Sequence, residues 1–407
     1  MVRDIMKVLM INSVCGFGST GSICVDIANS LEAEGHKCYI AYGQRNTTYH
    51  RAYKIGTKIE NHLHNLQSRA FGNQGYYSKN GTRKLIDFIK ELKPDVIHLH
   101  NLHGNYLHLE TLFKYLSSYE GKIVWTLHDC WAFTGKCTHY TDVNCQKWQT
   151  QCYKCPQVHK YPPSIFFDRT RGMYQDKKKW FISINNPAII TVSNWLRQEV
   201  RKSFLKNKDI HMIYNWIDHR TFRPYGTSRD ILDKYRLRGD IFTVITVSSS
   251  WTRGTVKWDD LTKLVSFFKD PIQFIVVGKI NHKLELPPNC VYIDYVHNKI
   301  ELAKLYNIAD VYVHLSTEDT FGKVIAEAMS CGTPAIVYDS TACPEILGKN
   351  CGYVVSKRDV KGIKKAIEEV RKNKKSFYSD YCRNQVLTYF DYHTNVNKTI
   401  DIYKALV

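Results

Sequence analysis

VYVHLSTEDTFGKVIAEAMSCGTPAIV, residues Val311 to Val337, contains the strongest fold signals in the chain. The apolar and β-branched run up to Leu315 predicts a strand. Good helix formers from Lys323 to Ser330 predict a helix, and Ala335 to Val337 predicts a second strand. A strand, a tight turn, a helix and another strand favour a parallel α/β sheet.

The turn inside this stretch combines two carboxylates with a helix N-terminus. Asp319 stands at the turn, Phe321 and Gly322 precede the helix, and Glu327 follows eight positions after Asp319. Free N–H groups and the helix dipole both favour a phosphate at such a terminus. Carboxylates suit the hydroxyls of a sugar and a ribose. This combination predicts a site for a sugar nucleotide.

Composition and length limit the possible classes of protein. The 407 residues favour two domains, and no apolar run approaches the length of a membrane span. The opening MVRDIMKVLMINS does not resemble a signal peptide, so we expect a cytoplasmic protein. A net charge of +19 indicates an anionic partner or a basic surface without a specific partner.

The N-terminus predicts a second βαβ unit. Strands are expected at Lys7–Asn12 and Cys38–Ala41, with a helix over Ser22–Glu34. The first turn carries the G-x-G-x-x-G pattern of Gly16, Gly18 and Gly21. The acidic residue that a dinucleotide site needs about 20 residues further on is absent, so the pattern does not favour NAD. It predicts a loop that lets a ligand approach the backbone.

Three histidines follow predicted strands in the first half of the chain. His100 and His103 come after the strand that begins at Asp95, and His128 follows the strand Ile123–Leu127. A lone histidine is more often structural than functional. Because parallel strands end at one sheet edge, where α/β proteins bind ligands, a functional and a structural interpretation are about equally plausible here.

Gly135–Pro163 is predicted to be an insertion that caps the pocket of the N-terminal domain, and it contains Cys137, Cys145, Cys152 and Cys155. In a reducing compartment, clustered thiols favour a metal over disulfides. The spacing is irregular, with one C-x-x-C. A structural zinc site and a reduced, packed loop are both left open, and a disulfide pair is less favoured.

Two further basic segments have alternative interpretations. Arg253 and Lys257 follow the predicted strand Ile241–Ser248, where they could neutralise a leaving diphosphate or be ordinary exposed charges. The predicted helix Asn194–Leu205 has an apolar stripe and a basic face. It could lie on an acidic membrane, but packing of the stripe on the sheet is the favoured interpretation.

Taken together, these motifs resemble retaining glycosyltransferases of family 4, which have two Rossmann-like domains (GT-B). The subgroup that the chain is most similar to builds bacterial capsule, O-antigen or exopolysaccharide. The motifs that carry the resemblance are Gly18–Gly21, Asp95–His100, Trp125–Asp129, Val192–Trp195, Asn215–Asp218 and, above all, Asp319–Glu327.

The resemblance implies an α/β fold with two Rossmann-like domains facing a cleft. We expect an N-terminal acceptor domain over residues 1–220, with the Cys-rich insertion at about 135–163. A nucleotide-sugar domain is expected over 221–388. Residues 389–407 are expected to form a helix that crosses back to the first domain.

The resemblance also implies roles for individual residues. Glu327 matches the family's ribose-binding Glu, and Asp319 stands where the family has its first Glu, with Glu318 beside it as the alternative sugar contact. Phe321 and Gly322 offer backbone N–H groups near the sugar and diphosphate. The other expected donor-binding residues are Thr320, Gly18, Ser19 and Thr20.

For catalysis, His128 matches a strand-end histidine near the reacting sugar, and Arg253 and Lys257 resemble the pair that holds the diphosphate. His100, His103 and Trp131 are expected on the acceptor side. Trp216 stands where relatives often have Gly.

The expected function is retaining, metal-independent transfer from a UDP or GDP sugar to a saccharide or polyprenyl-diphosphate-linked acceptor, with no cofactor in catalysis. A basic surface could also hold the protein on the anionic inner membrane face, and no specific nucleic acid is expected. Two alternatives remain. One is a GT-B-fold epimerase or phosphorylase, and the other is a basic, zinc-stabilised protein that binds nucleic acid or another partner.

Overall fold

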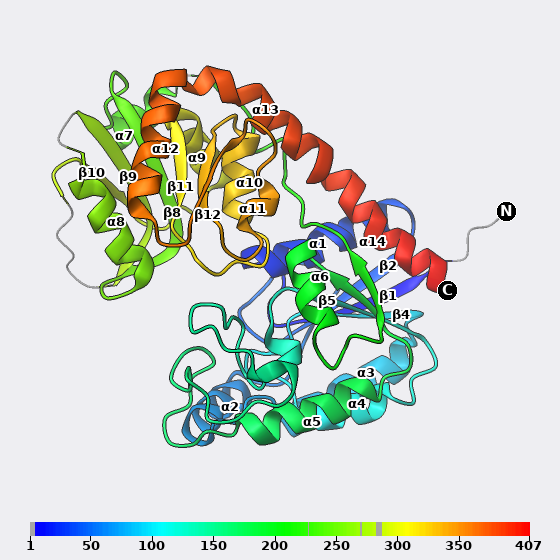
Figure 1. Cartoon of the computed structure of the whole chain (residues 1–407). Coiled ribbons are helices and arrows are strands. Elements are labelled where there is room, and N and C mark those ends of the chain that lie inside the picture. Colours follow the sequence, from blue (N-terminus) through cyan, green and yellow to red (C-terminus); the bar gives the residue numbers. More distant parts are fainter. Residues whose placement is uncertain (1–4, 227, 269–270, 282–286) are drawn as a thin grey trace. The chain divides into compact units, whose positions relative to one another are not determined.

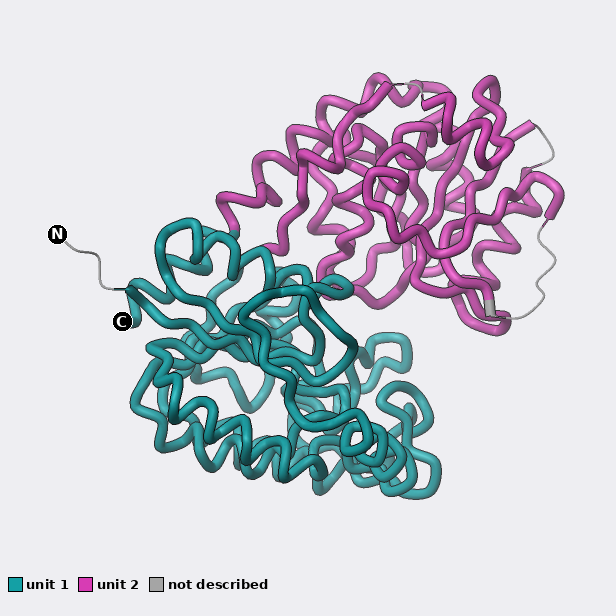
Figure 2. The backbone as a smooth tube through the Cα atoms, turned by 180° about the vertical axis from the view of Figure 1, so that it is seen from behind, with its two compact units in different colours: residues 1–213, 396–407 teal, residues 214–395 magenta. Residues whose placement is uncertain are grey.

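The computed structural model describes residues 5–226, 228–268, 271–281 and 287–407. The chain forms two compact units (Figure 2): unit 1 is Met1–Ile213 with Val396–Val407, and unit 2 is Tyr214–Asn395. The boundary between the two units, at Ile213 and Tyr214, therefore lies a few residues before the boundary that was expected at residue 220. The segment that follows it is tied to unit 2, because Ile217 N–H donates to the carbonyl of Phe390 at 2.9 Å and Ser330 Oγ donates to that of Phe222.

Unit 1 is built on a parallel sheet with the strand order β3-β2-β1-β4-β5-β6-β7. Its central strands are apolar runs buried on both faces, as a sheet covered by helices requires. The strands are β1 (Lys7–Asn12), β2 (Lys37–Tyr42), β3 (Ala52–Lys54), β4 (Val96–Leu99), β5 (Lys122–Leu127), β6 (Ala188–Thr191) and β7 (Asp209–Met212).

The helices of unit 1 connect these strands (Figure 1). They are α1 (Gly18–Ala33), α2 (Lys58–Phe71), α3 (Lys79–Leu92), α4 (Leu109–Leu116), α5 (Thr170–Ile182) and α6 (Asn194–Arg201), with 3₁₀ turns η1 (Trp131–Phe133) and η2 (Lys147–Gln149). Most of α14 (Tyr392–Leu406) also belongs to this unit. Its Tyr403 hydroxyl bonds His98 Nδ1 on β4 at 2.5 Å, so the C-terminal helix returns to the first domain as expected.

Unit 2 is built on a second parallel sheet, in the order β10-β9-β8-β11-β12-β13. The strands are β8 (Phe242–Thr252), β9 (Ile272–Asn281), β10 (Cys290–Ile293), β11 (Val311–His314), β12 (Ala335–Tyr338) and β13 (Gly352–Val355). The helices are α7 (Arg229–Tyr235), α8 (Val256–Ser266), α9 (Lys299–Ile308), α10 (Lys323–Ser330), α11 (Cys343–Ile346), α12 (Val360–Asn373) and α13 (Lys375–Tyr389). Each unit thus has one parallel α/β sheet, as the sequence predicts.

Several predicted elements have different bounds in the structure. Helix α1 begins at Gly18 rather than Ser22, so the G-x-G-x-x-G pattern runs into the helix. Strand β8 continues to Thr252 after a register shift between Val247 and Ser250. Gly278 of the neighbouring β9 allows this close approach, since a Cβ there would lie 1.9 Å from the Ser248 carbonyl oxygen.

Helix α6 ends at Arg201, and its apolar residues Leu196 and Val200 are fully buried. The favoured prediction, that this stripe packs inside the protein rather than on a membrane, is therefore confirmed. Among the helices in the described ranges, none is both long enough and apolar enough to cross a bilayer.

Candidate active site

The strand order of unit 2 marks one sheet edge as the place for a ligand. From β8 the chain moves to β9 and β10 on one side, and from β11 to β12 and β13 on the other. Parallel α/β sheets bind ligands beyond the carboxyl ends of the strands at such a switch point. Lys257 comes from the helix after β8, and Asp319 from the loop after β11. Neighbouring connections therefore bring these predicted residues to one edge.

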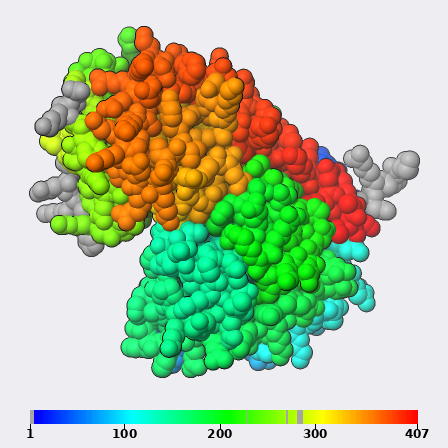
Figure 3. All heavy atoms as spheres, in the orientation of Figure 1, coloured from blue at the N-terminus to red at the C-terminus, as the bar shows by residue number. Residues whose placement is uncertain are grey.

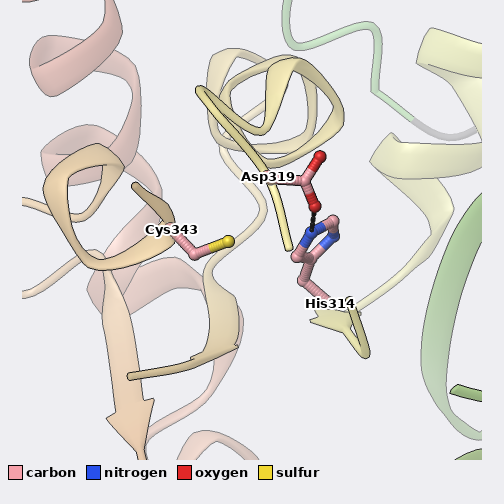
Figure 4. Close-up of side chains that lie close together, drawn as sticks. All are labelled: His314, Asp319 and Cys343. Atoms are coloured by element: carbon pink, nitrogen blue, oxygen red, sulfur yellow. Dashed lines mark hydrogen bonds and ion pairs between the residues drawn. The ribbon is translucent and has the colours of Figure 1, made fainter. Parts of the chain in front are cut away.

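Asp319 is held by a chain of hydrogen bonds (Figure 4). His314 Nε2 lies 2.8 Å from Asp319 Oδ2, and the Tyr312 hydroxyl lies 2.7 Å from His314 Nδ1. A carboxylate only accepts, so Nε2 carries the proton and Nδ1 accepts from the tyrosine. The Asp319 N–H also donates to Thr341 Oγ1 at 3.0 Å. These bonds fix the orientation of the Asp319 carboxylate, whose side chain is shorter than the Glu expected at this position.

Cys343 lies close to this pair, as Figure 4 shows. The ligand atoms of His314, Asp319 and Cys343 are all within 4.8 Å of one another, and they form the only such group of potential metal ligands in the part of the chain that is described. Burial raises the pKa of the Cys343 thiol well above its ordinary value. Within this group, a hydrogen bond joins His314 to Asp319 and orients the Asp319 carboxylate.

Glu327 lies on α10 and is 9% exposed. Burial raises the pKa of its carboxyl to about 7, although the positive charges of Lys323 and Lys299 oppose the shift. A carboxyl group in this state can exchange its proton near neutral pH. It is suited to accept hydrogen bonds from ligand hydroxyls, which replace the water it has lost.

The N-terminus of α10 has free N–H groups, because Gly322 is its N-cap and offers no capping side chain. Gly322 adopts a φ of +78°, and a Cβ there would lie 2.6 Å from Ile325 Cδ1, so glycine is required. Phe321 is buried, with its ring centroid 5.3 Å from Phe390 and 6.2 Å from Tyr214. The Phe321 side chain is therefore packed inside unit 2, at the turn that leads into the N-terminus of α10.

The two predicted cations have different surroundings. Lys257 Nζ donates to Ser248 Oγ at 2.5 Å, and burial lowers the pKa of its ammonium group while the charge of Asp319 raises it. Arg253 is exposed in the turn that follows the extended end of β8. Lys257 is thus electrostatically coupled to the Asp319 loop, whereas the structure gives no such link for Arg253.

In unit 1 the histidines gather at the ends of β4 and β5. His100 Nδ1 lies 3.0 Å from His128 Nε2, and the two rings are stacked. Burial lowers the pKa of His128 to about 4 and that of His100 well below its ordinary value, so both rings are neutral. Nε2 of His100 is buried without a hydrogen-bond partner among the described residues. His98, a residue not predicted, packs against His100 with ring centroids 4.0 Å apart and the rings tilted by 42°.

His103 joins a separate group nearby. Its Nε2 lies 2.8 Å from Asp129 Oδ2 and its Nδ1 3.1 Å from the Tyr161 hydroxyl. Burial works to raise the pKa of Asp129, but the charge and hydrogen bond of His103 outweigh it and hold that pKa below its ordinary value. Tyr161 also lines a pocket of about 180 Å³ whose wall includes Arg69 and Lys136. The pocket is therefore partly cationic.

Comparison with known proteins identifies the family. The model described as Glycosyltransferase Family 4 matches residues 20–221, and that described as Glycosyl transferases group 1 matches residues 258–384. The chain belongs to glycosyltransferase family 4. The putative colanic acid biosynthesis glycosyl transferase WcaC of Escherichia coli is 25% identical over 384 residues, which cover 87% of this glycosyltransferase and 88% of that protein.

Solved structures show the same GT-B fold. The sucrose-phosphate synthase of Thermosynechococcus elongatus matches with a TM-score of 0.73 at 15% identity, over 98% of this chain and 99% of that one. Anabaena HepE, crystallised with UDP and glucose, matches with a TM-score of 0.67 at 15% identity, over 98% and 100%. These family matches give no support to the binding-protein and epimerase alternatives that the charge and fold left open.

Several predicted residues of this glycosyltransferase lie away from these clusters or are buried. Gly18, Ser19 and Thr20 form the first turn of α1. Trp131 is 2% exposed and packs under Lys177, whose Nζ lies 4.0 Å from its ring centroid. Glu318 and Thr320 flank Asp319 in the loop. His314 was not predicted as a site residue. It is the last residue of β11, and His128 likewise stands directly after β5.

The four clustered cysteines all line one small pocket of unit 1. The insertion forms a broad part of the surface of this unit in Figure 3, where it is blue-green. The Cys137 and Cys155 thiols share a hydrogen bond, which lowers the pKa of Cys155 to about 7. Among the described residues, these four cysteines are not found as a group of three or more that could hold a metal ion. Zinc therefore stays a prediction beside the reduced, packed loop.

Metal analysis of the purified glycosyltransferase tests the zinc prediction. A structural site should carry about one equivalent of zinc per chain, retained through dialysis and lost when Cys152 and Cys155 are both replaced by serine. A variant that changes the buried Cys382 to serine serves as the control, because that thiol lies in unit 2. Zinc below about half an equivalent would leave the packed, reduced loop as the correct description.

Proposed function

We propose that this chain is a retaining, metal-independent glycosyltransferase that moves a sugar from a nucleotide-sugar donor to a saccharide or lipid-linked acceptor in bacterial surface polysaccharide synthesis. The observation that carries the proposal is the switch-point edge of unit 2. There, a free helix N-terminus, the buried Glu327 and the oriented Asp319 belong to one short segment. The pathway is inferred from WcaC, whose printed name refers to colanic acid biosynthesis.

On the donor side, each group has one chemical task. Glu327 would accept hydrogen bonds from the ribose hydroxyls, and Asp319 or its neighbour Glu318 from the sugar hydroxyls. The N–H groups at Gly322 would hold the diphosphate. The UDP and UDP-glucose complexes of HepE support a diphosphate sugar as the ligand, although only the fold relates that protein to this one.

Chemistry would be a front-side displacement in which the acceptor oxygen attacks on the face that the diphosphate leaves. The acceptor C–O bond forms as the bond to the diphosphate breaks, and the hydroxyl proton passes to the leaving phosphate oxygen. No protein nucleophile is required. Lys257 and the α10 N-terminus would stabilise the negative charge that develops on the diphosphate, with Arg253 as a second cation.

On the acceptor side, the neutral His128 would orient a hydroxyl of the sugar or acceptor. Its partner His100 has the buried, unpaired Nε2, which supports a polar ligand at this sheet edge. His103 and Tyr161 connect this edge to the pocket beside the exposed Arg69, whose guanidinium suits an anionic acceptor. Association with an anionic membrane from the cytoplasmic side would present such an acceptor.

Incubation with a panel of UDP and GDP sugars tests the proposal. The protein should release nucleoside diphosphate slowly from its own donor even without an acceptor, because water replaces the acceptor hydroxyl. Release should fall at least about 100-fold in Asp319→Ala, which removes the sugar contact. Replacing Asp310, whose carboxylate accepts from the Thr243 N–H at the opposite end of the sheet, by Asn provides the control. Failure of every sugar nucleotide to react would refute the transferase proposal.

A further inference from the structure

His314, Asp319 and Cys343 bring three kinds of metal-binding atom together at the switch-point edge of unit 2 (Figure 4). His314 ends β11, Asp319 follows in the loop after that strand, and Cys343 begins α11 after the neighbouring β12. The ligand atoms of the three residues all lie within 4.8 Å of one another. The connections that follow two adjacent strands thus supply an imidazole, a carboxylate and a thiol to one point.

This mixture of ligand atoms selects the kind of metal. Zinc binds imidazole nitrogen, thiolate sulfur and carboxylate oxygen, whereas magnesium and calcium prefer oxygen ligands. Zinc at its usual bond lengths holds its ligand atoms roughly 3.5 Å apart, so small side-chain rotations are enough to form the site. The Asp319 side chain is 32% exposed, which leaves a path for the cation and room for water as a fourth ligand. The set therefore suits zinc.

The hydrogen bonds around His314 suit a metal ligand. A metal-bound imidazole usually uses its second ring nitrogen for a hydrogen bond that fixes the ring. The Tyr312 hydroxyl lies 2.7 Å from His314 Nδ1, and a hydroxyl can accept as well as donate. When a cation takes Nε2, the neutral ring can carry its proton on Nδ1 and donate it to Tyr312. The ring thus exchanges its bond to Asp319 for a bond to the metal without losing its support.

Thr341 holds the Asp319 loop and the start of α11 together. Its Oγ1 accepts from the Asp319 N–H at 3.0 Å, and its side chain also shares a hydrogen bond with the Cys343 thiol. Its φ is +52°, a left-handed conformation that a β-branched residue seldom adopts. Strained residues of this kind persist where the surroundings fix them, often at functional sites. The spacing between the carboxylate and the thiol is therefore set by the fold.

We propose that His314, Asp319 and Cys343 bind a zinc ion reversibly and that the bound ion blocks the donor site. The cation joins His314 Nε2, an Asp319 carboxylate oxygen and the Cys343 sulfur, the thiol proton passes to water, and no electron is transferred. A metal-bound thiol is deprotonated because the cation offsets the charge of the thiolate. With water as the fourth ligand, the ion exchanges with the solvent and is removed by dialysis.

The ion takes no part in the transfer reaction. It occupies the Asp319 carboxylate, which would otherwise accept a hydrogen bond from the donor sugar. Zinc and the sugar nucleotide should therefore exclude each other, and each should weaken the binding of the other by the same factor. This consequence rests on the proposed function, whereas the metal site itself does not.

Cobalt is the direct probe, because it enters zinc sites and absorbs strongly when a thiolate binds it. The parent protein for the titration carries Cys152→Ser and Cys155→Ser, which removes the C-x-x-C of the insertion. Co²⁺ should produce a thiolate-to-metal absorption band that saturates at about one equivalent. The band should disappear in Cys343→Ala, and His314→Gln should need at least about tenfold more metal. Cys331→Ala, which changes another buried cysteine of unit 2, should keep the band.

Zinc inhibition measures the consequence for the donor. Saturating zinc should slow nucleoside diphosphate release by the parent protein at least about tenfold, and by less than about twofold in Cys343→Ala. Without zinc the two proteins should release it equally fast, and magnesium should not inhibit. The metal site is overturned if the parent gives no cobalt band or if Cys343→Ala keeps it. A band that Cys343→Ala loses, with release unaffected by zinc, would support the metal site and refute the contact between Asp319 and the donor.

Discussion

Replacing Glu327 with glutamine should make the ligand-free protein more stable above pH 7 and make donor binding much weaker. Burial raises the pKa of Glu327 from 4.5 to about 7. The folded state therefore holds a proton that the unfolded state releases, and wild-type stability falls as the pH rises from 4.5 to 7. Over about 2.5 pH units, at 1.36 kcal/mol each, the loss is about 3 kcal/mol.

Glutamine has no such proton, so Glu327→Gln removes the loss. The variant should match the wild type near pH 4.5 and exceed it by up to about 3 kcal/mol above pH 7, an increase of about 5 to 10 °C in Tm. Thermal unfolding from pH 5 to 8 measures this difference. If the Tm of the two proteins changed with pH by the same amount, the result would contradict a buried Glu327 that ionises in this range.

The same variant should bind nucleoside diphosphate about 100-fold more weakly at pH 8, because two charge-assisted hydrogen bonds from the ribose become neutral ones. Wild-type affinity should rise as the pH passes through about 7, while that of Glu327→Gln stays flat. A variant that is more stable and yet binds worse separates loss of function from loss of fold. Glu345→Gln, which changes a carboxylate bonded to Tyr214, is the matched control.

The second large effect is expected at Lys257. Lys257→Met should lower kcat by roughly 10²- to 10³-fold, as loss of one preorganised charge opposite a leaving group does. Stability should hardly change, because burial already disfavours the charge on this lysine and the methionine keeps its apolar stem. Steady-state kinetics with the best donor of the panel provide the measurement.

The lysine at the other end of the same helix is the control for this change. Lys263 is exposed in the last turn of α8, so Lys263→Met should retain full activity. Arg253→Met separates the two predicted cations. Since Lys257 is part-buried and feels the charge of Asp319, whereas Arg253 is exposed, we expect the Arg253 variant to lose less activity. If Lys257→Met kept the wild-type kcat, the leaving-group role would be wrong.

Much of unit 2 could be predicted from the sequence because its signals are local. The strand, turn and helix around Asp319 follow from β-branched residues, a glycine and helix formers within one short stretch. Parallel sheets then place loops after successive strands at one edge. The clustering of His100 with His128 was predictable for the same reason, as each residue directly follows its strand.

Other features depend on tertiary contacts that no local pattern reveals. His314 acts through its hydrogen bond to Asp319, a loop residue five positions away. Ser248 accepts a hydrogen bond from Lys257, which lies on the helix that follows β8. Helix α2 could not be predicted correctly from its apolar spacing, because the usual inference would place Ile59, Leu63 and Leu66 in the core. The structure buries the polar side instead, since Ser78 and Asn105 supply its partners.

The claim that unit 2 holds a nucleoside diphosphate is tested most directly by titration calorimetry with UDP and GDP. We expect one of them to bind the wild type with a stoichiometry of one. Glu327→Gln and Lys257→Met should each bind it markedly more weakly while remaining folded. Absence of binding by either nucleotide, or wild-type affinity in both folded variants, would contradict the account.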